Sequence, residues 1–456
     1  MRKLLQPAWG YVLELWKFLV QGWGRFWFTP SDPTTVAFIR ICTGLILTYI
    51  YATCFTEAEN FVGPYGWVDA IAIKQLRNVD ELALLHPAGR YDTQLQRSLH
   101  EWYLPSVYLL TNNPAAIRLI YGFFLAAMIC LTLGLFSRTA SILCWVGHIS
   151  FVQRGYLHWF GMDSVLAMLT LYLMFAPSGA VWSLDNLMRR ARNARQALAN
   201  KDAVLRDANP QPSWTANLTM RLIQIHMCII YFCAGCAKLQ GRSWWSGIAV
   251  WYTIMIPEFR LVDMSWLAKS EEIPWLPHLV SSLGVAATIF FEVGFPFLIY
   301  VRILRPLMLF LGVGMHAGIG LFMGLGGFGA SMLTGLSSFV SPSSFRWVAE
   351  TVLKGPDGYR FVYDRHDPRQ VDLASWVHAV DAWQQVELVE ASTTAAPAPA
   401  GSLVAPDGSV LCGSTAFLRL TRILRTLWLC WPLLALKFVT QAKRTSGEVQ
   451  PIAKKT

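Results

Sequence analysis

The chain has 456 residues, of which 38 are Lys or Arg and 28 are Asp or Glu, so charged side chains make up 14% and the formal net charge is +10. Soluble domains carry about 25% charged residues. This chain is instead 54% hydrophobic, and its mean hydropathy is +0.39. One or two soluble domains cannot keep so apolar a surface in water, so we expect an integral membrane protein. The positive charge does not indicate nucleic acid, because Lys and Arg stand in short loops between apolar runs.

Apolar runs along the chain predict membrane-spanning helices, which need about 20 mostly apolar residues to cross a bilayer. We expect an all-α polytopic bundle of about eight transmembrane helices, at residues 36–55, 115–136, 140–152, 164–184, 216–239, 278–301, 303–323 and 325–340. The third segment is short, and the last is Gly-rich and is either a span or a re-entrant segment. Residues 10–28 mix Trp with Lys and Arg, which is typical of a helix lying in the membrane interface.

The basic residues indicate the orientation of the bundle. Most of them stand in the predicted loop between the fourth and fifth spans, and the others stand at the N-terminus and in two short turns: Arg2, Lys3, Arg138, Arg189, Arg190, Arg192, Arg195, Lys201, Arg206, Arg302 and Arg305. All lie on one side of the membrane if the N-terminus is cytoplasmic, which agrees with the positive-inside rule. An even number of spans then leaves the C-terminus in the cytoplasm too. We expect the chain in a bacterial inner membrane, with the lipid bilayer as its first partner.

The composition changes after residue 344. Residues 355–390 are polar and charged, and residues 402–413 have the pattern of a hairpin with a Pro-Asp-Gly turn. A basic amphipathic helix is predicted at 414–426, followed by an apolar segment at 427–439 that is too short to span comfortably. The expected domains are an interfacial amphipathic helix at 1–30, a transmembrane domain at 31–345, a small cytoplasmic α/β domain at 355–440 with a short apolar C-terminal helix, and a disordered tail at 441–456.

Ionisable residues inside the apolar runs are the candidate functional residues. A charge at the middle of a bilayer costs at least about 2.5–3.5 kcal/mol, so a charge that is kept there faces a cavity or a partner. Five residues stand out on this ground: Asp163 at the start of the fourth span, His226 and Lys238 on the fifth, Glu292 on the sixth and His316 on the seventh. A polar pocket that opens to the outer half of the membrane is consistent with their positions.

Each of these residues also has a structural interpretation, and the sequence leaves both open. Lys238 can extend to the outer interface, Asp163 can cap the first turn of its helix, and the two histidines can be satisfied interior residues. Glu292 is the hardest to explain in this way, because no nearby residue in the sequence pairs with it. Cys233 and Cys236 have a redox spacing, but on an apolar helix Cys is mostly a small packing residue.

Motifs in chain order resemble the HTTM (horizontally transferred transmembrane) family, which includes the vitamin K-dependent γ-glutamyl carboxylase. They are FTPSDPTTVAFIRICTG at 28–44, FAPSGAVWSLD at 175–185, YFCAGCAKL at 231–239, WWSG at 244–247, EVGFP at 292–296 and GMH at 314–316. Together they extend over residues 25–340. The family segment that resembles 231–239 contains the lysine proposed as the catalytic base, and Lys238 stands at that position.

The resemblance implies a distinctive chemistry. In the family, a neutral lysine deprotonates a reduced quinone, which reacts with dioxygen. The strongly basic product removes a γ-proton from a peptide glutamate, and the carbanion adds CO2. A lysine desolvated in a membrane pocket suits the role of base. The implied cofactor is a reduced quinone, vitamin K or menaquinol, with O2 and CO2 as co-substrates, no metal, and a secreted peptide as the candidate substrate.

The resemblance also assigns roles to the five residues. Lys238 is the expected base, Glu292 and His316 tune or orient the pocket, and His226 and Asp163 are secondary members. The chain departs from the carboxylase at Ala237, where the carboxylase has the first of two adjacent lysines. It also lacks the histidine that the carboxylase has early in the fourth span. The large luminal domain that recognises substrates in the carboxylase is missing as well. These departures bear on carboxylation of protein glutamate more than on quinol-linked chemistry at Lys238.

The C-terminal part resembles a second family, the thioredoxin-like DCC family. The resemblance lies in VYD at 362–364, VAPDGSVLCG at 404–413 and AFLRL at 416–420. Members carry Cys-x-x-Cys just after the first strand, where this chain has RHDPRQ and no cysteine. We therefore interpret this part as a degenerate thioredoxin-like module that is structural or binds a partner, without disulfide exchange.

Two functions of different classes remain open on the sequence. The first is a membrane enzyme, a γ-carboxylase-like lyase or quinol-dependent oxygenase. The alternative is a non-enzymatic membrane accessory protein in peptide or toxin maturation or export. A transporter ranks third, because the sequence shows no inverted internal repeat.

Overall fold

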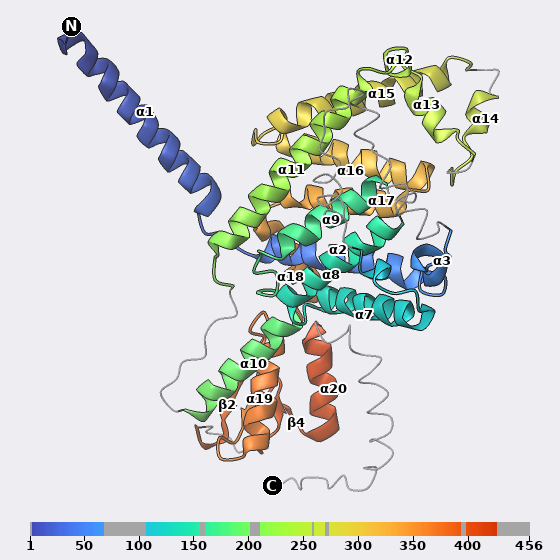
Figure 1. Cartoon of the computed structure of the whole chain (residues 1–456). Helices are drawn as coiled ribbons and strands as arrows, with labels where there is room; N and C mark the ends of the chain where they lie inside the picture. The colour runs from blue at the N-terminus through green and yellow to red at the C-terminus, as the bar shows by residue number, and fades with distance from the viewer. Residues whose placement is uncertain are drawn as a thin grey trace. The chain divides into compact units, whose positions relative to one another are not determined.

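The structure is a computed structural model that describes residues 2–67, 106–155, 160–200, 210–257, 260–269, 273–393 and 398–425. The chain divides into two units, one formed by Met1–Ser183 with Gln211–Pro342 and the other by Leu184–Pro210 with Ser343–Thr456. Figure 1 shows that the first unit is built of helices and that the second combines helices with a small sheet. The predicted short apolar segment 427–439 and the predicted tail 441–456 lie outside the described residues.

The first unit contains helices of very different length. They are α1 (Arg2–Phe28), α2 (Thr34–Thr53), α3 (Ala58–Val62), η1 (Val107–Leu109), α7 (Pro114–Leu133), α8 (Ser137–Arg154), α9 (Gly161–Leu173), α11 (Trp214–Lys238), α12 (Arg242–Trp245), α13 (Ala249–Ile254), α14 (Ser265–Ala268), α15 (Leu276–Leu298), α16 (Arg305–Phe322), α17 (Gly326–Leu336) and η3 (Ser337–Phe339). The long helices α11, α15 and α16 pack in sequence, and α17 packs against both α11 and α16 (Figure 1).

Five helices in the described part of the chain are long and apolar enough to cross a membrane: α2, α7, α11, α15 and α16. They coincide with five of the predicted spans, as expected for a polytopic helical membrane protein. The other three predicted segments are also helical, but their helices are too short or too polar to be counted with these five. The helix α17 has 11 residues. The helix α8 buries a row of polar side chains, among them Ser141, His148 and Arg154, which lowers its apolar character.

The predicted span at 164–184 is wrong in its C-terminal half. The helix α9 ends at Leu173 and has 13 residues. Residues 174–183 turn instead, and Pro177 and Gly179 stand in this segment. Proline lacks the N–H that a helix needs, and glycine weakens a helix through its backbone freedom. The apolar composition continues past the end of the helix, which explains why the sequence pattern overestimates its length.

Two hydrophobic clusters form the core of the first unit. One joins α2, α9, α11, α15, α16 and α17 around residues such as Ile223, Phe291 and Met332. The other joins α2, α7, α8 and α9 around residues such as Tyr121 and Leu166. Because α2 and α9 contribute to both clusters, they link the two halves of the bundle.

The second unit contains a four-stranded sheet in the order β2-β1-β3-β4. Its elements are α10 (Leu184–Ala199), α18 (Pro342–Leu353), β1 (Tyr359–Tyr363), α19 (Pro368–Val380), β2 (Val386–Glu390), η4 (Ala391–Thr393), β3 (Leu403–Val404), β4 (Val410–Leu411) and α20 (Gly413–Ile423). The strands β1 and β2 are parallel, and α19 connects them. The strand β3 is antiparallel to both of its neighbours, with Phe361 of β1 opposite Leu403. The predicted hairpin is confirmed, and Gly408 in its turn has a φ of +82°.

The segment between α9 and α11 differs from the predicted cytoplasmic loop of the transmembrane domain. Much of it forms α10, which groups with the C-terminal residues and packs against α19. Arg190 donates hydrogen bonds to the carbonyl oxygens of His378 and Asp381, and Arg195 pairs with Asp372 at 2.7 Å. Some of the basic residues that suggested topology therefore also hold this unit together.

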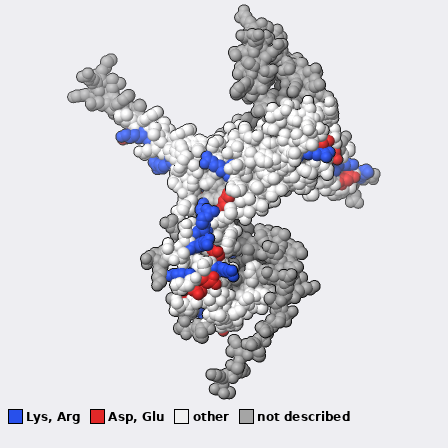
Figure 2. Space-filling model, turned by 60° about the horizontal axis from the view of Figure 1, so that its bottom comes forward, with Lys and Arg blue, Asp and Glu red and all other residues white. Residues whose placement is uncertain are grey.

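Charged side chains are unevenly distributed over the described surface. In Figure 2 the helical unit is mostly white, whereas Lys, Arg, Asp and Glu gather on the second unit. Among the described residues, many large apolar side chains of the helical unit are exposed, for example Phe310 at 74%, Leu119 at 75% and Phe297 at 66%. Large exposed apolar surfaces of this kind are typical of faces that contact a membrane or another protein.

Candidate functional site

Lys238 and Glu292 form an ion pair between α11 and α15. Lys238 is the last residue of α11, and its Nζ donates a hydrogen bond to Glu292 Oε1 at 2.8 Å. The Glu292 side chain is 7% exposed and the Lys238 side chain is 26% exposed. The carboxylate is therefore buried, whereas the lysine side chain is partly exposed. The structure brings these two sequence-predicted residues together, and the glutamate that lacked a partner in the sequence has one in space.

Gly235 sets how closely α11 approaches α15. It is buried one turn before Lys238. A Cβ at this position would lie 2.8 Å from Val293 Cγ2 and 3.1 Å from Glu292 Cβ, so a side chain would force the helices apart. Small residues at helix contacts allow this kind of close approach in membranes. Residues three apart share a helix face, so the same close contact directs Lys238 toward Glu292.

The chain folds back over Lys238 after α11 ends. The N–H of Gly241 donates to the carbonyl oxygen of Lys238 at 3.0 Å, which closes a tight turn. The Trp244 ring then lies over the amine, with its centroid 5.4 Å from Nζ, in a cation–π contact. Further along, the N–H of Trp251 donates to Ser281 Oγ at 3.0 Å and fastens α13 to α15. These contacts hold an aromatic ring beside the ion pair.

Tyr231 and His316 form a second polar pair next to the first. Tyr231 lies two turns before Lys238 on the same face of α11. Its hydroxyl shares a hydrogen bond with His316 Nε2 at 2.9 Å, and the two residues are 1% and 2% exposed. Among the described residues, His316 Nδ1 and Glu292 Oε2 are buried without a hydrogen-bond partner. Buried polar atoms in proteins are normally paired, so these two atoms have capacity for a water, a proton or a ligand.

His226 lies away from this cluster. It is 12 residues before Lys238 on α11, which is about 18 Å along the helix axis. Its Nδ1 shares a hydrogen bond of 3.0 Å with the Tyr172 hydroxyl on α9. The structure therefore supports the interpretation of His226 as a satisfied histidine and does not bring it to Lys238.

Asp163 also lies elsewhere, at the start of α9. Its carboxylate accepts a hydrogen bond from the N–H of Phe160 at 3.1 Å, which is the contact of a helix-capping residue. Its carbonyl oxygen shares a hydrogen bond of 3.0 Å with His148 Nε2. Of the two interpretations left open for Asp163, this geometry fits the cap.

Tyr231 and Trp244 stand in the motifs quoted above but are not among the site residues predicted from the sequence. Their spacing from Lys238 does indicate that both lie near it. Tyr231 is seven residues before Lys238, which places it on the same helix face. Trp244 follows Lys238 by six residues in a Gly-containing turn. Neither is ionisable at neutral pH, so a search for charges inside apolar runs passes over them.

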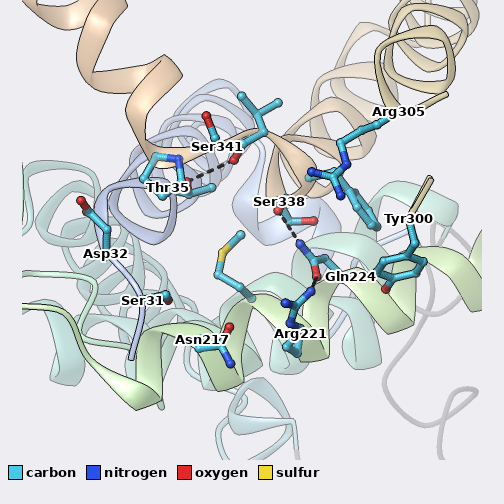
Figure 3. Close-up of a pocket in the computed structure, with 14 residues that line it drawn as sticks. Ser31, Asp32, Thr35, Asn217, Arg221, Gln224, Tyr300, Arg305, Ser338 and Ser341 are labelled. Carbon is cyan, nitrogen blue, oxygen red and sulfur yellow. Dashed lines mark hydrogen bonds between the residues drawn. The ribbon is translucent and has the colours of Figure 1, made fainter. Parts of the chain in front are cut away.

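Two cavities are described in the first unit, and neither is lined by Lys238 or Glu292. One, of about 220 Å³, lies among the start of α2, the start of α11 and the ends of α15 and η3 (Figure 3). The other, of about 190 Å³, is mostly apolar and is lined by Asp163, Phe160 and Phe151 among others. No group of three or more His, Cys, Asp or Glu side chains in the described ranges is arranged to hold a metal ion.

Comparison with known proteins adds no relative: no family model matches the chain, and no curated protein or solved structure matches it either. The sequence motifs and the geometry around Lys238 are therefore what indicate a function. The described geometry consists of a partly exposed lysine side chain, a buried carboxylate with one oxygen that has no hydrogen-bond partner among the described residues, and a buried Tyr–His pair. Chemically, this set can accept, store and pass on a proton within an apolar surrounding.

The contact at Gly235 gives the first testable prediction. Replacement of Gly235 by Leu is expected to destabilise the protein by about 1–3 kcal/mol, because the new side chain meets Val293 and the backbone of α15. Gly314 on α16 is the matched control, since a Cβ there meets nothing within 4 Å. Thermal unfolding of both variants in detergent measures the difference. Equal stability of Gly235→Leu and Gly314→Leu would show that the close contact is unimportant.

Proposed function

We propose that the chain is a membrane enzyme in which Lys238 acts as the base of a quinol-dependent reaction of the carboxylase type. The observation that carries the proposal is the ion pair between Lys238 Nζ and the buried Glu292 Oε1 at 2.8 Å. A Lys–Glu pair inside an apolar bundle adds little net stability, because the cost of desolvating the two charges offsets their attraction, and ionisable residues in such places usually have a function. The motif around Lys238 resembles the base-containing segment of the HTTM family, and this favours chemistry.

The pair provides a route for one proton. In the ion pair the proton resides on Lys238 Nζ, and when it moves along the hydrogen bond to Glu292 Oε1 the amine becomes neutral. The neutral amine can then take a proton from a molecule bound beside it. Glu292 Oε2 and His316 Nδ1 accept no hydrogen bond from the described residues and so remain available to stabilise or relay the proton.

Lys238 lines neither described cavity, so the head of a reduced quinone would bind beside Trp244 rather than in an enclosed pocket. The Trp244 ring offers an aromatic face beside Nζ, and the buried free atoms of Glu292 and His316 offer polar partners for ring hydroxyls. A reduced quinone would supply an acidic hydroxyl, and it would supply two electrons to dioxygen. Both the quinone and dioxygen partition into lipid. Lys238 would take the hydroxyl proton, and the ring packed on Trp244 would keep bulk water from the amine.

The proposed substrate is a glutamate-containing secreted peptide or a small molecule that gains CO2. The resemblance to the family supports carboxylation, whereas Ala237 in place of a first lysine leaves Lys238 to act alone. We also propose that about eight segments enter the membrane with both termini in the cytoplasm of a bacterial cell. The basic residues near the start of α11 and of α16 support this orientation.

For the second unit we propose a thioredoxin-like fold without redox activity. Support comes from the order β2-β1-β3-β4, the parallel β1–α19–β2 connection, and the antiparallel β3–β4 hairpin followed by α20. At the place of the family's cysteine motif, Asp367 accepts a hydrogen bond from the N–H of Arg369 and caps α19. A helix cap therefore stands where the family has its cysteine motif. We propose that the surface of this unit binds a partner.

The direct experiment supplies a reduced menaquinone to the protein in lipid nanodiscs and measures oxygen uptake. Uptake that requires both quinol and protein supports the enzyme. A second step adds a glutamate-rich peptide and bicarbonate, and mass spectrometry then looks for a gain equal to one CO2. If neither oxygen uptake nor a mass gain occurs with any quinol tested, the enzyme proposal is wrong.

The alternative is a non-enzymatic accessory protein in peptide or toxin maturation or export. The same ion pair is compatible with this alternative, because a Lys–Glu contact at the end of α11 can also serve only to hold α11 against α15. The two functions differ in what a charge-retaining variant does. Lys238→Arg keeps a cation that can pair with Glu292, but an arginine cannot act as a base at neutral pH. An accessory protein should therefore tolerate this variant, whereas the enzyme should lose its activity.

A further inference from the structure

The cavity at the other end of α11 is separate from the Lys238 site. It lies where α2 begins, where α11 begins, where α15 ends and where η3 leads into residues 340–342. Arg221, which lines it, is 17 residues before Lys238, or about 25 Å along the helix. In Figure 3, Arg221, Gln224, Ser338 and Arg305 lie on one side of the cavity, and Asp32 lies on the opposite side.

Two guanidinium groups line this cavity without being neutralised by their described contacts. Arg221 Nη1 donates to the amide oxygen of Gln224 at 2.9 Å, and Arg305 Nε donates to the carbonyl oxygen of Ile299 at 3.1 Å. Both acceptors are uncharged. The carboxylate of Asp32 also lines the cavity, but its Oδ1 accepts hydrogen bonds from the N–H and hydroxyl of Thr34.

Hydrogen-bonding capacity is left over around the two arginines. Among the described residues, Arg221 Nε, Ser31 Oγ and Ser338 Oγ are buried without a hydrogen-bond partner, and Ser338 is only 2% exposed. Gln224 holds the position of Ser338, since its Nε2 donates to the Ser338 carbonyl oxygen at 2.7 Å. The guanidinium Nε–H can only donate, and the two serine hydroxyls can also donate, so a group with several acceptor oxygens would satisfy all three.

We propose that this cavity binds a phosphate group. A phosphate offers several acceptor oxygens and negative charge, which match the two guanidinium groups and the two serine hydroxyls, and arginine forks suit its geometry. The group belongs either to an anionic phospholipid or to a soluble phosphate or phosphomonoester. Both sources present the same phosphate oxygens to the cavity. The site lies where α15 ends and α16 begins, next to the basic residues 302 and 305. The inference does not depend on the proposed function of Lys238.

The test measures thermal unfolding of the full chain in a phosphate-free detergent buffer. Inorganic phosphate is compared with chloride at equal ionic strength. Short-chain phosphatidic acid is compared with the diacylglycerol that has the same acyl chains. A ligand that binds only the folded protein raises the unfolding temperature with its concentration, and the curve gives the affinity. Stabilisation by phosphatidic acid alone identifies a lipid as the source, and stabilisation by both ligands identifies the phosphate group itself.

The variants are Arg221→Gln, Ser338→Ala and the control Arg302→Gln. Arg302 is an exposed cation in the same turn as Arg305, but it does not line the cavity. Loss of the charge-assisted contact is expected to weaken binding roughly ten- to a hundredfold in Arg221→Gln, with no loss in Arg302→Gln. Ser338→Ala removes a hydroxyl that bonds to no described residue, so it should fold normally and still bind more weakly. Equal affinity in all four proteins, or no saturable stabilisation by either ligand, would overturn the proposal.

Discussion

Replacement of Lys238 by Ala is expected to lower quinol-dependent oxygen uptake by about a hundredfold or more, since a positioned base contributes on the order of 10²–10⁴-fold to proton transfer. The Lys238 amine lies beside a buried carboxylate, and the Lys238 side chain as a whole is 26% exposed. Without it, Glu292 has no described partner to exchange a proton with. Oxygen uptake by nanodisc-embedded protein, measured with an electrode at saturating quinol, gives the rate.

Two further variants separate catalysis from structure in this experiment. Lys238→Arg keeps a cation that can bond to Glu292, but a guanidinium does not release its proton at neutral pH, so uptake should fall as far as in Lys238→Ala. Arg242→Gln is the matched control, because Arg242 is an exposed cation one turn beyond Lys238 in α12. Full activity in Lys238→Arg would contradict the role of Lys238 as base.

Removal of one member of the ion pair is expected to destabilise the protein more than removal of both. Lys238→Met leaves the Glu292 carboxylate buried without its counter-charge, and breaking a buried pair in this way costs about 3–5 kcal/mol. The double variant Lys238→Met with Glu292→Leu leaves no charge behind and should unfold close to the wild type. Denaturant unfolding of the wild type, Lys238→Met, Glu292→Leu and the double variant in the same detergent gives the coupling between the two residues.

The same series tests whether the pair exists mainly for stability. If the double variant is stable and also retains any quinol-dependent activity, Lys238 and Glu292 form a lock and the chemistry lies elsewhere. If the double variant is stable and inactive, the protein folds without the pair and requires it for function. Additive losses in the two single variants would show that Lys238 and Glu292 do not interact in the membrane.

The positions of the long helices could be predicted from the sequence, because a bilayer requires a long apolar run and such runs are local. The spans expected at 36–55 and 216–239 agree with α2 and α11. The end of α9 could not be predicted by the same rule, since residues 174–183 remain apolar in composition while Pro177 and Gly179 break the helix. The grouping of α10 with the C-terminal unit could not be predicted either, because its partner α19 lies far away in the sequence.

The candidate site shows the same division. Lys238, Glu292 and His316 were found because each is an ionisable residue inside an apolar run, which is a local property. His226 satisfies the same criterion and lies about 18 Å along α11 from Lys238. The sequence cannot distinguish the two histidines, because the distinction depends on which helix each one faces. Tyr231 could not be predicted as a site residue, because its hydrogen-bond partner, His316, stands 85 residues further along the chain.

The sequence alone determined that this chain is apolar enough for a membrane, which runs form its long helices, and which few residues carry charge within them. Those properties follow from composition and local periodicity. Only the tertiary structure decided that Lys238 meets Glu292, that Asp163 caps a helix, and that Arg221 and Arg305 share a cavity. Such pairings depend on how closely two helices pack and in which register, and at α11 and α15 the absent side chain of Gly235 permits that close approach.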